Sequence, residues 1–381
     1  MMNICIVAGA RPNFIKVAPL IHAIENMQNT AAEQTVPSYQ LVYTGRADDP
    51  TLETSLFNDL QIPHPHTFLN ADCENLNELT GQVMAAFEHY LQNHAVDVVI
   101  VVDDLASTMA VSIVTKKQGI CLAHIAAGTR SFDINMPKEI NRLVIDGLSD
   151  VLFTAGISNN SIANRAGTEL SRVYMVGNIL MDNLRHNHGR WKKPMLTLPA
   201  SFNMQRSAAN LPTSYLVFTL NRKALIADKE KLAGMVKAIV THANGTPVIA
   251  PLRGRAAEVI SQILREMHIP SSAFILHDAL SYLEFGWLTM HAQGIITDSG
   301  NVAEEATFNG VPCITLNSYT EHIETVKVGS NVLVGEDPQQ LAMFVEQMTS
   351  GKWKKCAIPD RWDGRTAERI IQILAEKARL A

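Results

Sequence analysis

The chain has 381 residues, 47% apolar and 18% charged, so it can bury two ordinary domain cores and is too apolar for disorder. A net charge of −5 gives no electrostatic reason to expect nucleic acid or an anionic membrane as a partner. No apolar run is as long as a bilayer span, and the N-terminus lacks the basic segment of a signal peptide. Five cysteines without a CxxC pair favour a reduced, cytoplasmic protein. Thirteen histidines without HxH or HExxH spacing predict no metal site.

Apolar strand-like runs alternate with helix-period segments along the whole chain, which is typical of parallel βαβ units. The first half predicts strands at residues 3–8, 40–44, 96–102, 120–125, 151–154 and 173–176, and helices at 13–27, 106–117 and 137–148. A segment rich in Asn, His, Gly, Lys and Pro, residues 177–212, is interpreted as the connection between domains. The second half predicts strands at residues 215–219, 247–251, 274–276, 312–316 and 332–334, and helices at 228–242, 255–267, 281–290, 338–348 and 365–377. We therefore predict an α/β fold of two doubly wound, Rossmann-like domains facing a central cleft, with ligands at the carboxyl ends of the strands.

The turn at Asp298, Ser299 and Gly300 joins an apolar strand to a helix and is the first candidate for a ligand site. Free backbone N–H groups and the positive end of the helix favour an anion there, most often a phosphate. Glu304 and Glu305 lie one turn into the helix, where a carboxylate can accept hydrogen bonds from the hydroxyl pair of a ribose. The alternative is an ordinary strand-to-helix turn in which Ser299 is only the N-cap.

Charged side chains also follow predicted strands of the first half. Arg11 follows the first strand, where its guanidinium can bind phosphate or can simply face solvent. Asp103 and Asp104 follow the strand at residues 96–102; one of them can act as a general base, or either can cap the next helix. Arg130 follows the strand at residues 120–125.

Two more segments contain candidate side chains. Glu139 and Arg142 are three residues apart, so they can pair on a helix surface, or Glu139 can face the cleft as a second carboxylate. Asn221 follows the first strand of the second half, where its segment can meet a phosphate from the other side of the cleft.

Together these segments resemble the non-hydrolysing UDP-N-acetylglucosamine 2-epimerase family, whose fold is similar to that of the GT-B glycosyltransferases. The match keeps chain order and runs nearly end to end. Its motifs are Gly9-Ala10-Arg11-Pro12, Thr44-Gly45, Asp104 through Ser107-Thr108, Ala127-Gly128-Thr129-Arg130-Ser131, Pro137-Lys138-Glu139-Ile140-Asn141-Arg142, Val176-Gly177-Asn178, Thr297-Asp298-Ser299-Gly300, Glu304-Glu305, Thr320-Glu321 and Asp363-Gly364-Arg365. The resemblance implies an N-terminal domain at residues 1–178, a UDP-binding domain at 179–363, and a last helix at 364–381 that packs back on the first domain. It also implies a homodimer.

The resemblance further implies that Ser299 and Gly300 hold the diphosphate of UDP and that Glu305 holds the ribose. It places Arg11 at a phosphate and Asp104 and Glu139 near the sugar. The remaining residues assigned to substrate binding by this likeness are Arg130, Asn221, Asn301 and His322. The implied chemistry removes the proton at C2, expels UDP to leave a glycal, and adds UDP back with a proton on the other face. It uses no cofactor and no metal.

Several positions depart from the family pattern. The usual His-Gly-Asp reads Val102-Asp103-Asp104, and the usual His-Val-Glu-Ala-Gly reads His124-Ile125-Ala126-Ala127-Gly128, so that a carboxylate becomes the methyl group of Ala126. An expected histidine is Asn221, an expected arginine is His322, and a second glycine is Asn301. Asp103 is a candidate replacement for the missing carboxylate, although side-chain alternation along a strand argues against equivalent geometry.

Three hypotheses follow from this pattern. The first is a UDP-GlcNAc 2-epimerase that interconverts UDP-GlcNAc and UDP-ManNAc for cell-surface polysaccharide precursors. The second, favoured by Ala126 and Asn221, is a UDP-sugar-binding homologue with little or no turnover. The third is a hydrolysing or glycosyl-transferring variant that uses the same nucleotide-sugar cleft. In all three, the residues that keep the family pattern favour a nucleotide-sugar ligand, and we expect a UDP-N-acetylhexosamine.

Overall fold

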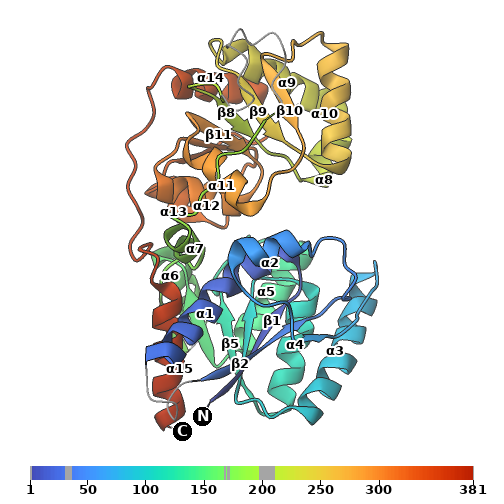
Figure 1. The fold of residues 1–381 in the computed structure, drawn as a ribbon, viewed down its shortest axis with the longest axis vertical. Helices are drawn as coiled ribbons and strands as arrows, with labels where there is room; N and C mark the ends of the chain where they lie inside the picture. The colour runs from blue at the N-terminus through green and yellow to red at the C-terminus, as the bar shows by residue number, and fades with distance from the viewer. Residues whose placement is uncertain (1, 31–36, 167–168, 170–171, 197–210, 381) are drawn as a thin grey trace. The chain divides into compact units, whose positions relative to one another are not determined.

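The computed structural model describes residues 2–30, 37–166, 169, 172–196 and 211–380, and Figure 1 traces the chain. The chain divides into two compact units. Unit 1 contains Met1–His186 together with Asp360–Ala381, and unit 2 contains Asn187–Pro359. Residues 197–210 of the predicted interdomain connection lie outside the described residues.

Unit 1 is built on a parallel seven-stranded sheet in the order β3-β2-β1-β4-β5-β6-β7. The strands are β1 (Asn3–Ala8), β2 (Ser38–Tyr43), β3 (Thr67–Phe68), β4 (Val98–Val102), β5 (Cys121–Ile125), β6 (Val151–Thr154) and β7 (Val173–Met175). The strand order reverses between β1 and β4. In doubly wound sheets the crevice beyond the carboxyl ends of the strands at such a switch point is where ligands bind.

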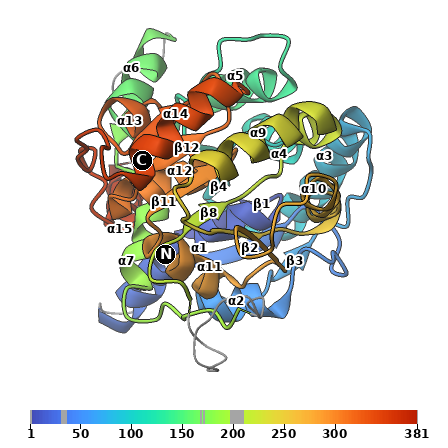
Figure 2. The same ribbon diagram turned by 90° about the horizontal axis from the view of Figure 1, so that it is seen from above.

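Helices cover both faces of this sheet because its strands are apolar on both faces. Cys5 and Val7 pack with Val99 and Val101 against one helix layer, whereas the intervening Ile6 and Ile100 are buried on the other face. The first layer is α3 (Leu76–Asn93), α4 (Ala106–Lys117) and α5 (Pro137–Leu148). Helices α1 (Arg11–Thr30), α7 (Leu180–His186) and α15 (Thr366–Leu380) pack on one another in a second group, and Figure 2 shows α1 and α4 on opposite sides of β1. The remaining helices of unit 1 are α2 (Thr54–Leu60) and α6 (Ile157–Arg165).

Helix α7 begins within the segment that the sequence suggested as a connection, and it belongs to unit 1. Its Asp182 accepts hydrogen bonds from the backbone N–H groups of Thr366 (3.1 Å) and Ala367 (2.8 Å), at the first turn of α15. These bonds satisfy donors that have no partner within α15 itself. Asp182 therefore fixes the returning C-terminal helix on unit 1.

Unit 2 repeats the architecture with a parallel six-stranded sheet in the order β10-β9-β8-β11-β12-β13. The strands are β8 (Leu216–Phe218), β9 (Val248–Pro251), β10 (Phe274–His277), β11 (Gly294–Thr297), β12 (Cys313–Thr315) and β13 (Asn331–Leu333). The helices are α8 (Lys223–Ala227), α9 (Lys229–His242), α10 (Gly254–Glu266), α11 (Tyr282–Met290), α12 (Gly300–Asn309), α13 (Ile323–Lys327) and α14 (Pro338–Thr349). The switch point lies between β8 and β11.

Side-chain alternation along the strands of unit 2 divides its core into two layers. Leu216, Phe218 and Ile296 point toward the side covered by α9, α10 and α14. Val217 and Ile295 point toward the side covered by α11 and α12. The predicted α/β class with two doubly wound, Rossmann-like domains is confirmed. Among the described residues no helix combines the length and apolarity needed to cross a bilayer.

Gly128 and Gly147 provide a matched test of the turn after β5. Gly128 has φ of 71°, and a Cβ there would lie 2.2 Å from the backbone oxygen of Asn159; Gly147, inside α5, has no atom within 4 Å of an added Cβ. Gly128→Ala is expected to lower the free energy of unfolding by about 2 kcal/mol or more. Gly147→Ala is expected to raise it by about 0.5–1 kcal/mol. Thermal unfolding should therefore move in opposite directions for the two variants, and a shared direction would contradict the strained turn.

Candidate active site

In unit 1, the turns that follow β1 and β4 are joined by buried polar contacts. Asn13 accepts hydrogen bonds from the backbone N–H groups of Gly9 (2.9 Å) and Ala10 (3.2 Å). Its side-chain amide donates to Asp103 (2.9 Å), and Lys16 forms an ion pair with the other carboxylate oxygen of Asp103 (2.5 Å). Asp103 has φ of 60°, in the left-handed region that Asp tolerates better than most residues. Its carboxylate therefore links the two turns.

Asp104 turns the other way, toward α5. Its Oδ2 accepts from Arg142 Nε (2.8 Å) and Nη2 (2.6 Å), and its Oδ1 pairs with Lys138 (3.3 Å). Burial raises the pKa of Asp104, but the charges of Lys138 and Arg142 outweigh it and hold that pKa below its usual value. The N-cap of α4 is Leu105 without a side-chain cap, so the alternative that either aspartate caps this helix is wrong.

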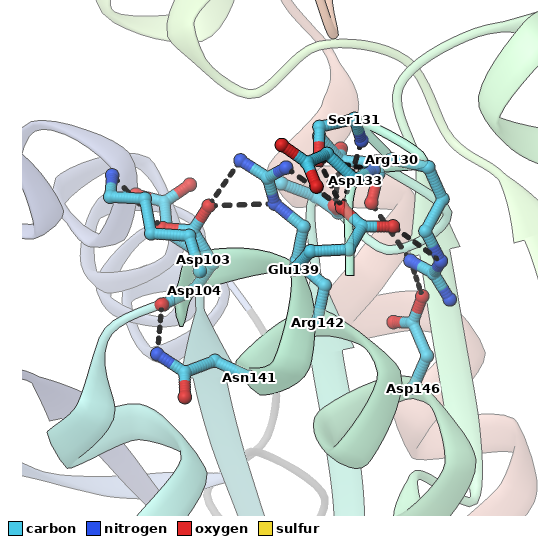
Figure 3. A network of polar contacts seen from close by, with 12 residues as sticks. Asp103, Asp104, Arg130, Ser131, Asp133, Glu139, Asn141, Arg142 and Asp146 are labelled. Carbon is cyan, nitrogen blue, oxygen red and sulfur yellow. Dashed lines mark hydrogen bonds and ion pairs between the residues drawn. The ribbon is translucent and has the colours of Figure 1, made fainter. Parts of the chain in front are cut away.

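Glu139 is buried, with 3% of its surface exposed, and shares Arg142 with Asp104, as Figure 3 shows. Its Oε2 accepts from the backbone N–H of Ser131 (2.8 Å), the hydroxyl of Ser131 (2.9 Å) and Arg142 Nη1 (3.2 Å). Burial raises the pKa of Glu139, but the hydrogen bonds from Ser131 and Arg142 lower it by more, so the pKa lies below its usual value. The expected pairing of Glu139 with Arg142 exists, but inside the protein and not on the helix surface.

A second ion pair fixes Arg130 beside this network. Arg130 Nη1 lies 2.6 Å from Asp146 Oδ2, and its Nε lies 3.9 Å from Glu139 Oε1. Asp146 also accepts from the backbone N–H of Gly128 (3.0 Å) and is 2.6 Å from His124 Nδ1. Burial raises the pKa of Asp146, but His124 and Arg130 bring it below its usual value. Asp146 thus holds both the β5 turn and Arg130 in place.

Ala126 and Arg11 follow the carboxyl ends of β5 and β1, the strands on either side of β4. Ala126 follows β5 with φ of 67°, and its carbonyl accepts from the Thr129 hydroxyl (2.8 Å). Arg11 is the first residue of α1, immediately after the turn held by Asn13. Arg11, Asp104, Glu139 and Arg130 therefore all lie at the carboxyl edge of the sheet in unit 1.

In unit 2, Asp298 organises the turn between β11 and α12. Its Oδ2 accepts from the backbone N–H groups of Asn221 (2.7 Å) and Arg222 (2.6 Å), which joins the turn after β8 to the turn after β11. Ser299 is the N-cap of α12 and accepts from Val302 N–H at 3.5 Å, so the capping interpretation also describes this residue. A hydroxyl at an N-cap leaves other backbone donors of the first turn directed outward, where an anion can bind.

The first turn of α12 is bordered by His322 and two glutamates. A Cβ on Gly300 would lie 2.5 Å from His322 Nε2, and His322 Nδ1 lies 2.7 Å from Glu304 Oε1. Asn301 follows Gly300 in the same turn. Glu305 is 8% exposed, and no described residue hydrogen-bonds its carboxylate. Burial, with a smaller contribution from Glu304, raises the pKa of Glu305 to about 7.

The structure thus groups the predicted residues into two sets. Asp104, Glu139 and Arg130 share one network in unit 1, whereas Asp103 belongs to the adjacent contacts with Lys16. Ser299, Gly300, Asn301, Glu305, His322 and Asn221 surround the carboxyl ends of β8 and β11. Sequence reasoning missed Asp146 altogether. It placed Asp298 and Glu304 at the strand-to-helix turn but did not predict that they contact the turn after β8 and His322. The described part of the chain holds no group of three or more His, Cys, Asp or Glu side chains arranged for a metal ion.

The chain has two parallel sheets, and in each the strand order reverses at a switch point of the kind where nucleotides bind. This architecture places the chain in the class of GT-B-like α/β proteins. The chain belongs to the UDP-N-acetylglucosamine 2-epimerase family, whose model matches residues 30–375. The UDP-N-acetylglucosamine 2-epimerase of Methanocaldococcus jannaschii is 33% identical, over 98% of this chain and 99% of that protein. The UDP-2,3-diacetamido-2,3-dideoxy-D-glucuronate 2-epimerase of Pseudomonas aeruginosa is 30% identical, over 98% and 100%. A crystal structure of the M. jannaschii enzyme in complex with UDP-GlcNAc and UDP matches with a TM-score of 0.82 at 31% identity, over 98% of this chain and 100% of that one.

Proposed function

We propose that the protein is a UDP-N-acetylglucosamine 2-epimerase that interconverts UDP-GlcNAc and UDP-ManNAc by eliminating and re-adding UDP. Family membership over nearly the whole chain and the UDP-GlcNAc complex of the M. jannaschii enzyme support this assignment. The observation that carries it is the pair of buried carboxylates, Asp104 and Glu139, which cations and N–H donors hold ionised at the switch-point edge of unit 1.

In this proposal Asp104 and Glu139 exchange the proton at C2. The C–H electron pair forms the C1–C2 double bond as the bond from C1 to the diphosphate oxygen breaks, and UDP leaves. The abstracted proton exchanges with solvent, the other carboxyl group takes up a proton and delivers it to the opposite face of C2, and UDP returns to C1 to give the epimer. We assign Arg11 to the departing diphosphate and Arg130 to the sugar.

Unit 2 supplies the groups assigned to UDP. The first turn of α12 offers backbone donors at Ser299 and Gly300, and the turn itself is fixed by Asp298. Glu305 is a buried carboxylate that no described residue hydrogen-bonds, which is costly unless a ligand donates to it. Two ribose hydroxyls would provide those donors. Asn221, Asn301 and His322 complete the set assigned to the nucleotide.

Product analysis by NMR tests the proposal. With UDP-GlcNAc as substrate, we expect the anomeric signal of UDP-ManNAc to appear without stoichiometric release of UDP. Stoichiometric free UDP would instead identify a hydrolase, and ligand line broadening with no product would identify a binding protein. The binding alternative is favoured by two features of the sequence, the methyl group of Ala126 where the resemblance implies a carboxylate, and Asn221 where it implies a histidine.

The altered position at the end of β5 gives a prediction of its own. Ala126 is half-buried at the carboxyl edge of the sheet, between Asp104 and Arg130 in chain order. Ala126→Glu restores a carboxylate where the family has one and is expected to raise kcat about tenfold or more. Ala126→Gln, of the same shape without the charge, is the control. Equal effects of the two variants on kcat would show that the added charge has no catalytic role.

The homodimer, cytoplasmic location and supply of cell-surface polysaccharide precursors remain parts of the proposal. They rest on the family likeness and on the composition of the chain. Sedimentation velocity of the purified chain tests the dimer directly, because a monomer and a dimer of this 41.9 kDa chain separate clearly.

A further inference from the structure

Within the described part of the chain, the side chain of Arg142 contacts both candidate proton-transfer groups, Asp104 and Glu139. Its Nε and Nη2 lie 2.8 and 2.6 Å from Asp104 Oδ2, and its Nη1 lies 3.2 Å from Glu139 Oε2. Figure 3 shows the guanidinium between the two carboxylates. All three side chains are largely buried, with exposed fractions of 6% for Arg142, 13% for Asp104 and 4% for Glu139.

Charges of alternating sign extend this arrangement on both sides. Lys138 pairs with the outer oxygen of Asp104 at 3.3 Å, and Arg130 lies 3.9 Å from Glu139 while it pairs with Asp146 at 2.6 Å. The other charged or polar groups that face these residues are Ser131 from the β5–α5 loop, His124 from β5, and Asp103 from the β4 turn, paired with Lys16 of α1. A single cation shared by two carboxylates is the centre of this series.

We infer that Arg142 is a positioning residue that couples Asp104 and Glu139 into one acid–base pair, which binds a first proton more readily than a second. The inference rests on the proposed function and extends it, because it assigns the two proton transfers at C2 to a pair that works without a carboxylate at Ala126.

The physical basis is the competition of two carboxylates for one guanidinium. While both are ionised, they repel each other across Arg142. When one takes the proton from C2, the repulsion disappears and the guanidinium remains fully engaged with the other carboxylate, which therefore stays ionised. Two such groups titrate as a pair, with separate macroscopic steps. One protonated and one ionised carboxyl group is the state that the elimination leaves. The second carboxyl group returns a proton to the other face of C2 only after a proton has reached it, from the first group or from solvent.

The test compares Arg142→Met and Arg142→Lys with a matched control, Arg255→Met. Arg255 forms the same i, i+3 pair with a glutamate, Glu258, at 3.1 Å, but both side chains are exposed, by 75% and 65%. The first readout is the carboxyl ¹³C titration of the ligand-free protein. In Arg142→Met we expect the pKa of both Asp104 and Glu139 to rise, by about one unit or more. In Arg142→Lys we expect smaller rises, and none in Arg255→Met.

The second readout is the pH–rate profile. Arg142→Met is expected to lower kcat about 10²–10³-fold with little change in KM, and to move the acidic limb of the profile upward by about one unit. Arg142→Lys should recover part of the loss, and it also serves for the titration if Arg142→Met does not fold.

A rise in the pKa of only one carboxyl group, or a lower kcat with an unchanged profile, would overturn the coupling and leave Arg142 a packing residue. The titration keeps this test separate from the proposed function. If the wild-type protein does not convert UDP-GlcNAc but both carboxyl groups respond to Arg142, the function fails and the coupling holds.

Discussion

Glu139→Gln is expected to lower kcat for UDP-GlcNAc about 10²–10⁴-fold, the cost of removing one proton-transfer group. Glutamine matches the shape of Glu139, and its oxygen can still accept the N–H of Ser131, so the fold of the loop should survive. An amide cannot take the proton from C2. Conversion of UDP-GlcNAc measured by NMR, together with the thermal unfolding curve, separates lost chemistry from lost structure.

Glu258→Gln is the matched control for Glu139→Gln. Glu258 pairs with an arginine three residues away, as Glu139 does, but on an exposed face of α10. The control is expected to keep the wild-type kcat. A Glu139→Gln variant that unfolds normally and turns over at the wild-type rate would remove Glu139 from the mechanism.

Glu305→Gln is expected to weaken UDP binding about 10–100-fold, because an amide is a weaker acceptor for two ribose hydroxyls than a carboxylate. The pKa of Glu305 in the free protein is about 7, and hydrogen bonds to the ionised form favour that form. UDP binding should therefore release a proton from Glu305 near pH 6 and become tighter toward pH 7. Calorimetry in two buffers of different ionisation enthalpy counts this proton. The phosphate of UDP also titrates, so the proton released by Glu305 is the number released by wild type minus the number released by Glu305→Gln. Equal proton release by the two proteins would contradict the ribose assignment.

The same residue predicts a pH dependence of stability. The pKa of Glu305 rises from 4.5 to about 7 on folding, so the folded protein favours the neutral carboxyl group. Its contribution is fully present below pH 4.5 and is lost as the pH rises through about 7, a total of roughly 3 kcal/mol. Glu305→Gln should lack this decline and be more stable than wild type at pH 8 in the absence of UDP. Parallel stability–pH curves for the two proteins would show that burial does not raise this pKa.

The α/β fold could be predicted because the core strands are continuous apolar runs. Val98–Val102 is buried at every position, and parallel strands covered on both faces require such runs. Helix α3 gave a weaker signal, since only Val83, Phe87 and Tyr90 of its 18 residues are buried. Strand β3 has two residues, too few for any periodic pattern.

The sequence predicted which strand ends carry the candidate site residues, but it did not predict which side chains these residues contact. The sequence placed Asp103 and Asp104 together, yet the left-handed backbone at Asp103 sends their carboxylates to Lys16 and Arg142 respectively. Spacing offered a Glu139–Arg142 pair as one of two alternatives, but it did not predict that Arg142 also reaches Asp104, 38 residues away in the chain. Contacts between separate elements have no local sequence pattern.

The neighbours Glu304 and Glu305 show the same limit in unit 2. Both were expected near the nucleotide, but Glu304 contacts His322 and only Glu305 retains a carboxylate without a hydrogen bond from a described residue. Their difference arises from the direction of successive side chains around α12 and from the position of His322, which chain order does not specify.

Exchange of the C2 hydrogen in D₂O tests the central claim most directly. Starting from UDP-GlcNAc, and separately from UDP-ManNAc, the wild-type protein should replace the C2 proton with solvent deuterium and reach the same mixture of the two sugars from either side. Retention of the original C2 proton in the product, or no reaction from either side, would contradict epimerisation by proton transfer at Asp104 and Glu139.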